Sequence, residues 1–153
     1  MVRRMCAVLL AVVLMLSASA LAEQAVRELS GYYDRDIAAA AAEIGELSYA
    51  AGDEFRDNYE NDQLALRGRD GKVAVIELKA GIGPFTLCGV SAGMGRDEVK
   101  ALFTGYPKLW EFEEEVGYTI VENKQDEIES LTLVVFFDES GRVEGAWYRN
   151  AEG

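Results

Sequence analysis

The segment 131–149 constrains the fold most, because it holds two apolar stretches separated by a turn. Residues 131–137 are apolar at odd and even positions, and residues 142–149 follow after Asp138-Glu139-Ser140-Gly141. Since successive side chains of a strand point to opposite faces, both faces of this hairpin need explaining. One face must pack against helices. We expect the neighbouring half of the chain to cover the other, with an exposed patch that binds a partner as the alternative.

Two short helices are predicted from apolar residues at helical spacing. The first is expected after Asp34, a possible N-cap, and before Gly45, and its apolar residues are Ile37, Ala41 and Ile44. The second is expected to begin within residues 93–99 and to stop at Gly105, and its apolar residues are Val99, Leu102 and Phe103.

The remaining elements are predicted to be strands and loops, which gives an α+β fold. Asp70-Gly71 is a strong hairpin signal between strands 64–67 and 72–79. Residues 52–63 are expected to form an acidic loop or an irregular edge strand. Further strands are expected at 85–90, 110–116 and 118–122, followed by a polar loop at 123–127.

The two halves of the chain follow the same order, a helix ended by glycine and later a hairpin. The hairpins end in the tripeptides Gly-Lys-Val at 71–73 and Gly-Arg-Val at 141–143. This order suggests a tandem duplication with units 31–80 and 85–150. The alternative is that many α+β proteins show a helix before a hairpin twice.

Residues 1–22 have the features of a secretory signal peptide. Arg3 and Arg4 precede an unbroken apolar run from Met5 to Leu16, and small residues follow it. We expect cleavage between Ala22 and Glu23, with cleavage after Ala20 as the alternative. A membrane anchor would need about 18–20 apolar residues, and a run of twelve is too short. The protein is therefore expected to be secreted or periplasmic, as a domain of residues 23–153 without a membrane span after cleavage.

The charge of the mature chain excludes some classes of partner. All 27 acidic residues lie after position 22, whereas two of the 15 basic residues are Arg3 and Arg4, so the mature net charge is −14. Such a charge disfavours nucleic acids and anionic membrane surfaces as partners. Only Cys88 remains after cleavage, which rules out an internal disulfide. We expect Cys88 to be a small, partly shielded hydrophobic residue, with an intermolecular disulfide as the alternative.

The segment 90–148 resembles the BamE/SmpA-like group and the related β-lactamase inhibitor protein fold. The helix signature G-M-[ST]-x-x-x-V of these modules is matched by Gly93, Met94 and Val99, and their hairpin signature by Asp138, Gly141 and Val143. The resemblance implies helices on one face of a sheet whose other face can bind a protein, and the inhibitor is itself a tandem of two such units.

This chain departs from that family pattern in three respects. Gly95 replaces the usual capping Ser or Thr, although glycine is tolerated at an N-cap. The disulfides of the inhibitor are missing, and no cysteine stands where a lipid anchor would be attached. The resemblance therefore transfers neither a β-lactamase target nor an outer-membrane assembly role.

The composition argues against catalysis. The chain has no histidine, which removes the commonest general base near neutral pH and the commonest zinc ligand. We expect no enzyme activity and no cofactor or metal. Two alternatives remain: a small cell-envelope enzyme that uses a carboxylate pair, and an acidic secreted protein that binds a cation through oxygen atoms of the 53–62 segment (Asp53, Asp57, Glu60, Asn61 and Asp62).

Aromatic residues indicate where a partner would bind. Strand alternation places Trp110 and Phe112 on one face, and it places Val143, Gly145 and Trp147 on one face of the last strand. Acidic residues near them would form a negative rim. We therefore predict a non-catalytic module that binds an unidentified protein with a basic surface, through a site that includes Trp110, Phe112 and Trp147.

Overall fold

The computed structural model describes residues 25–51, 57–81, 83–124 and 127–150, and these form an α+β fold. Eight antiparallel strands build one sheet in the order β2-β3-β4-β5-β10-β9-β8-β7. The strands of the first half are β2 (Ser48–Ala51), β3 (Asp57–Glu60), β4 (Leu64–Arg69) and β5 (Lys72–Leu78). Those of the second half are β7 (Lys108–Glu111), β8 (Glu115–Lys124), β9 (Glu127–Phe137) and β10 (Val143–Asn150).

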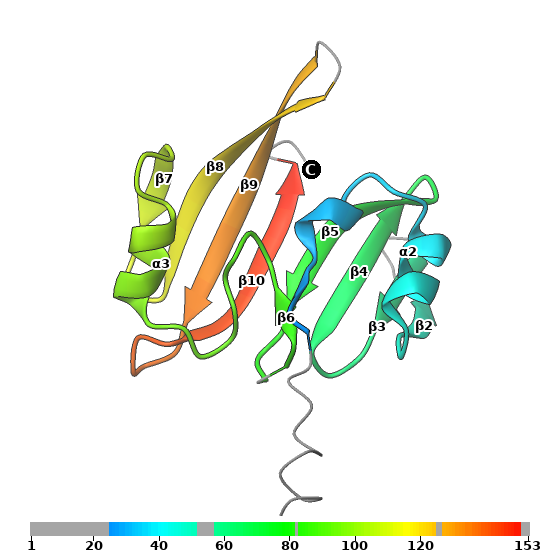
Figure 1. The fold of residues 1–153 in the computed structure, drawn as a ribbon, viewed down its shortest axis with the longest axis horizontal. Coiled ribbons are helices and arrows are strands. Elements are labelled where there is room, and N and C mark those ends of the chain that lie inside the picture. Colours follow the sequence, from blue (N-terminus) through cyan, green and yellow to red (C-terminus); the bar gives the residue numbers. More distant parts are fainter. Residues whose placement is uncertain (1–24, 52–56, 82, 125–126, 151–153) are drawn as a thin grey trace, which may run out of the picture.

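Both described α-helices pack on the same face of this sheet. Helix α2 (Ile37–Ile44) lies over one end and α3 (Arg96–Leu102) over the other (Figure 1). In α3 the buried Val99 faces the sheet, and Phe103 directly after the helix stacks on Tyr118 of β8. Inward-facing residues from all the strands between β4 and β8 join one apolar core with both helices. The opposite face of the sheet carries no helix from the described residues, and we call it the open face.

The two halves meet edge to edge, through their last strands. Strand β5 pairs with β10, so that Val75 lies opposite Arg149 and Leu78 opposite Ala146. The expectation that one half covers the second face of the closing hairpin is therefore wrong. The physical reason is that each half offers an unpaired strand edge, and joining these edges satisfies backbone hydrogen bonds along the whole seam.

The start of each helix is tied to the hairpin of its own half in the same way. The helix N-cap residue forms a β-bridge with the residue after the hairpin glycine, as Asp36 does with Lys72 and Gly95 with Arg142. Three backbone hydrogen bonds surround each bridge. They are Ile37 N to Gly71 O, Asp34 N to Val73 O and Val73 N to Arg35 O in the first half, and Arg96 N to Gly141 O, Gly93 N to Val143 O and Val143 N to Met94 O in the second.

These ties correct one predicted helix boundary. Asp34 does not cap α2; its φ of 61° and its backbone bond to Val73 place it in the turn before the helix. The N-cap is Asp36, whose carboxylate accepts a hydrogen bond from Ala39 N at 2.8 Å. The predicted apolar face is confirmed, because Ile37, Ala41 and Ile44 are buried along with Ala40.

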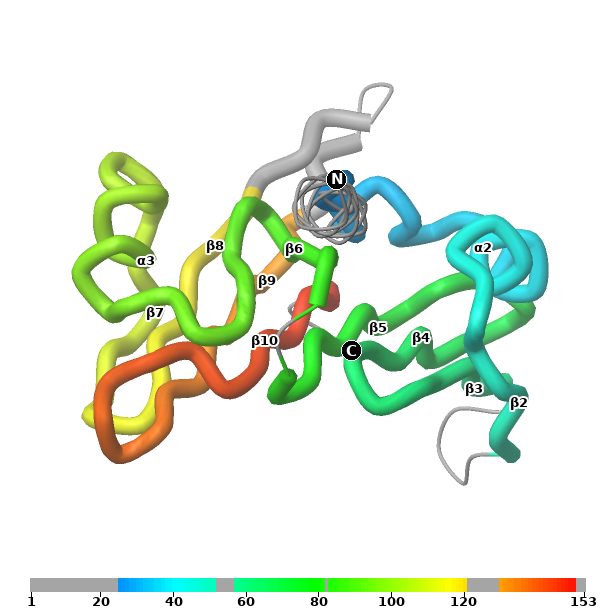
Figure 2. Tube along the Cα trace, turned by 60° about the horizontal axis from the view of Figure 1, so that its bottom comes forward, coloured from blue at the N-terminus to red at the C-terminus, as the bar shows by residue number. Residues whose placement is uncertain are grey.

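A short strap covers the middle of the sheet between the two helices. It consists of the parallel pair β1 (Arg27–Glu28) and β6 (Phe85–Thr86) and the 3-10 turn η1 (Ser30–Tyr32). Figure 2 follows this blue segment from the middle of the molecule to α2. Burial raises the pKa of Glu28, but hydrogen bonds from the backbone N–H groups of Ser30, Gly89 and Cys88 outweigh it, and the pKa falls below its usual value.

Cys88 lies in the turn that follows β6 and not in a strand. The predicted strand 85–90 ends at Thr86, because Cys88 and Gly89 form a turn with positive φ angles of 53° and 81° between the bridged residues Leu87 and Val90. The expected partial shielding is confirmed, since Cys88 is half-buried.

Two other strand predictions need correction. Trp110–Val116 and Tyr118–Glu122 are not separate strands divided at Gly117, since β7 ends at Glu111 and β8 runs from Glu115 through Gly117 to Lys124. Ser48–Ala51 forms the edge strand β2, which the sequence did not indicate. The cleavage site between Ala22 and Glu23 lies outside the described residues. Within the described residues, no helix combines the length and the apolar character that a membrane crossing requires.

Candidate functional site

The open face carries a row of aromatic residues in the second half, beginning with Trp110 at the sheet edge. Trp110 of β7 lies opposite Gly117 of β8, and Gly117 lies opposite Val134 of β9. A Cβ atom on Gly117 would stand 2.7 Å from two ring atoms of Trp110. The indole therefore lies flat on β8 at a place that only glycine leaves open.

The row continues with Trp147 on β10. Trp147 lies opposite Val134, and its ring meets that of Phe136 edge to face, with the ring centres 5.1 Å apart. Phe136 is half-buried, whereas 39% of Trp147 is exposed. The strand pairing thus brings Trp110 and Trp147 to one face of the sheet.

Val143, which was predicted to share a face with Gly145 and Trp147, points to the opposite face of the sheet. A β-bulge between Val143 and Gly145 adds a residue to β10 and reverses the alternation before it. Val143 is consequently buried in the core beside Phe137, while Gly145 and Trp147 lie on the open face.

Among the described residues, Phe112 is the most exposed aromatic residue of this face, with 63% of its surface exposed. Its N–H donates to Glu115 O at 2.8 Å, which continues the alternation that places Trp110 on the open face. Arg96 of α3 holds the turn by donating to the carbonyls of Phe112 and Glu113, and its guanidinium lies 4.1 Å from the ring centre of Phe137. A helix on the core side therefore fixes the loop that presents Phe112. We call Trp110, Phe112, Phe136 and Trp147 the aromatic patch.

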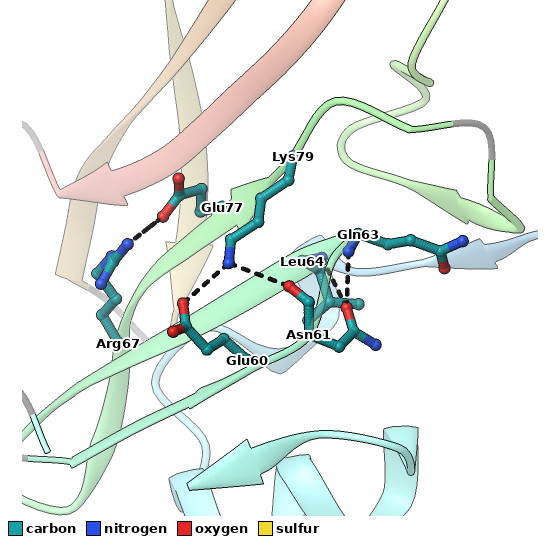
Figure 3. A network of polar contacts seen from close by, with 7 residues as sticks. All are labelled: Glu60, Asn61, Gln63, Leu64, Arg67, Glu77 and Lys79. Atoms are coloured by element: carbon teal, nitrogen blue, oxygen red, sulfur yellow. Dashed lines mark hydrogen bonds and ion pairs between the residues drawn. The ribbon is translucent and has the colours of Figure 1, made fainter. Parts of the chain in front are cut away.

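The open face of the first half is charged, and its charges are paired (Figure 3). Arg67 of β4 and Glu77 of β5 form an ion pair with 2.5 Å between Nη2 and Oε2. Lys79 contacts Glu60 of β3 at 2.8 Å and also donates to Asn61 O. The hydrogen bond from Lys79 keeps the pKa of Glu60 below its usual value.

Two of the residues proposed as cation ligands, Glu60 and Asn61, already have other contacts. The carboxamide oxygen of Asn61 accepts hydrogen bonds from the backbone of Gln63 and Leu64, and Glu60 pairs with Lys79. Asp53 lies outside the described residues. In the part of the chain that the structure describes, no three His, Cys, Asp or Glu residues are grouped so that they could hold a metal ion.

The residues that carry the resemblance stated above contact one another, and they do not lie in the aromatic patch. Asp138 accepts hydrogen bonds from Ser140 and from Arg142 N, and Arg142 in turn donates to Gly93 O at 3.0 Å. Met94 O receives the N–H of Val143. These residues therefore shape the junction of helix and hairpin.

Sequence reasoning missed two contributors to the aromatic patch. Phe136 was left out of the predicted site, and Gly117 fell between the predicted strands 110–116 and 118–122. The apolar run on both faces of 131–137 was a signal for Phe136, whereas the role of Gly117 depends on a neighbouring strand. Asn58 Oδ1 and Trp110 Nε1 are buried on this face and have no hydrogen-bond partner among the described residues.

Comparison with known proteins does not assign this chain to a group: no family model, no curated protein and no solved structure matches it.

Proposed function

We propose that this protein is a non-catalytic module that binds another protein through the aromatic patch on its open sheet face. The observation that carries the proposal is the position of Trp147 and Phe112. Both large apolar side chains are substantially exposed on a face that lacks a helix from the described residues. Contiguous exposed apolar surface is rare on proteins that act alone and usually marks an interaction site.

The energetics of the patch fit protein recognition. Rigid aromatic side chains lose little entropy on binding, and a hot-spot aromatic contributes about 2–4 kcal/mol when a partner buries it. Trp110 packs on Gly117 and Trp147 packs on Phe136, so both are ordered before a partner arrives. This preorganisation lowers the entropy that binding must overcome.

The two-unit order supports the tandem-duplication hypothesis. The bridge from the N-cap to the hairpin and its three hydrogen bonds occur once in each half, at residues 34–37 with 71–73 and at residues 93–96 with 141–143. We infer that the halves descend from one helix-plus-meander unit. This inference also supports the resemblance to the β-lactamase inhibitor protein fold, whose members are tandems of such units.

Export remains part of the proposal, and it rests on residues 1–22. We propose that the module acts in the periplasm or outside the cell after cleavage between Ala22 and Glu23. N-terminal sequencing of the protein recovered from the producing cells tests this directly. A first residue of Glu23 supports export, whereas an intact Met1 in the cytoplasmic fraction contradicts it.

Capture by substituted proteins tests the binding site. The mature protein and its variants Trp147→Ala and Phe112→Ala would be crosslinked in the envelope fraction of the producing cells, and the crosslinked proteins would be identified by mass spectrometry. The matched control is Tyr49→Ala, because Tyr49 is 57% exposed but pairs with Tyr59 on the helix side. The proposal requires one protein that wild type and Tyr49→Ala capture and that both patch variants lose. Equal capture by all variants contradicts it.

A further inference from the structure

The carboxylates of a groove beside the aromatic patch have no ion-pair partner among the described residues, in contrast to Glu60 and Glu77 of the first half. The groove has a volume of about 870 Å³, and Phe136 is in its lining. Its acidic lining consists of Glu113, Glu114, Glu115, Asp138, Glu139 and Glu144, and its basic lining is Arg96. Within the described residues, Glu77 and Glu60 on the same sheet face each have an ion-pair partner, whereas none of these six carboxylates has one.

Two of the charged lining groups are occupied within the protein. Arg96 donates to the carbonyls of Phe112 and Glu113, and the Asp138 carboxylate accepts hydrogen bonds within its own turn. Five glutamates therefore gather negative charge in the groove without an ion-pair partner among the described residues, while Arg149 lies over the ring of Trp147 at 5.9 Å from its centre. Like charges gathered in this way repel one another, and a cation relieves that repulsion.

We infer that the partner of the open face presents an arginine or lysine side chain, which enters this groove while apolar surface of the partner covers Trp147 and Phe112. The inference rests on the proposed binding function and names the chemistry of the partner. Charge complementarity selects a basic partner and accelerates its association.

The structure contains an internal example of this recognition. The Arg96 guanidinium sits over the ring of Phe137, 4.1 Å from its centre, with backbone oxygen atoms accepting from its N–H groups. The neighbouring Phe136 on β9 points to the open face, where Glu115 lies opposite it and Glu144 lines the same groove. A partner cation over Phe136 would combine a ring face with carboxylates, which is a favourable cation–π setting.

Synthetic peptides test this inference without a known partner. The probe is a dodecapeptide of alternating arginine and glycine, and its comparison peptides carry lysine or glutamate in place of arginine. Binding would be followed by NMR of backbone amides of the mature protein. We expect shifts concentrated at residues 113–115 and 136–144 for the arginine and lysine peptides and none for the glutamate peptide. Shifts spread over the whole surface overturn the inference.

Charge variants distinguish peptide binding in the groove from attraction by the overall negative charge of the protein. Glu115→Gln/Glu144→Gln should weaken arginine-peptide binding about 3- to 10-fold, because each charge pair near a surface contributes about 0.3–0.7 kcal/mol. The matched control Glu46→Gln/Asp62→Asn removes two exposed acids outside the groove and should change affinity less than 2-fold. Equal weakening in both variants overturns the inference. Circular dichroism confirms that each variant is folded.

The two proposals can fail separately. Suppose that Trp147→Ala no longer captures the protein, whereas Glu115→Gln/Glu144→Gln binds it at full affinity. The protein-binding function then stands, and the inference that the partner inserts a basic side chain is wrong. If the groove binds the arginine peptide as expected but neither patch variant loses a captured protein, the proposed function is wrong.

Discussion

Replacement of Gly117 by alanine should destabilise the protein, although alanine usually stabilises a strand. The added Cβ would stand 2.7 Å from Cε2 and Cζ2 of Trp110, whereas carbon atoms in contact are about 3.5–4.0 Å apart. The indole must therefore move by about 1 Å or leave the sheet. Overpacking of this kind costs about 1–3 kcal/mol, and the intrinsic gain from replacing glycine is about 0.5–1 kcal/mol. The net loss should be about 1–2 kcal/mol.

A double-mutant cycle isolates this contact. In a Trp110→Ala background the ring is gone, and Gly117→Ala should then raise the free energy of unfolding by about 0.5–1 kcal/mol. Urea unfolding followed by far-UV circular dichroism measures all four proteins, because the signal does not depend on the removed tryptophan. If Gly117→Ala has the same effect in both backgrounds, the close packing of Trp110 on β8 is refuted.

Four further predictions follow from the described contacts. Tyr148→Ala should cost about 3–5 kcal/mol because Tyr148 is fully buried, whereas Trp147→Ala should cost less than about 1.5 kcal/mol in the same urea assay; similar losses would make Trp147 a core residue. Gly71→Ala and Gly141→Ala should each cost about 1–2 kcal/mol through their φ angles of 77° and 74°, and a neutral result at either would contradict the matched turns. Glu28→Gln should lower stability by about 1 kcal/mol at pH 7, with solvent screening included, and the difference should vanish as the pH falls through the lowered pKa of Glu28 and protonates the wild-type carboxylate. Glu111, paired with Lys100 and Lys108, should titrate with a pKa of about 2 by NMR, and Lys100→Gln should raise that pKa. The stability that these pairs contribute is present above the ordinary pKa of 4.5 and is lost as the pH falls towards 2.

Local sequence signals predicted the elements whose partners lie close in the chain. Both helices, the Asp70-Gly71 hairpin and the closing hairpin are present, because periodicity and turn residues act over a few positions. Local sequence signals gave wrong strand boundaries where pairing with a strand distant in the sequence decides where a strand begins or ends. Gly117 fell between two predicted strands, yet it continues β8 because β7 and β9 hydrogen-bond to either side of it.

The candidate site was predictable only in part. Alternation within a strand placed Trp110 with Phe112 and singled out Trp147. Whether all three share a face depends on which strands are neighbours in the sheet, and alternation does not give that order. The bulge at Val143 and Gly145 shows the limit of counting positions, since one extra residue moved Val143 into the core. Strand β2 has no apolar alternation, and its existence depends on the edge that β3 offers.

The seam between β5 and β10 determines when the sheet is complete during synthesis. Strand β5 is made about seventy residues before β10, and until the last strand arrives its apolar edge has no neighbour on that side. During that interval the first half presents an open template for strand pairing, which is the state in which newly made chains associate with one another. The first half therefore gains a neighbour for its β5 edge only when residues 143–150 at the other end of the chain have been made.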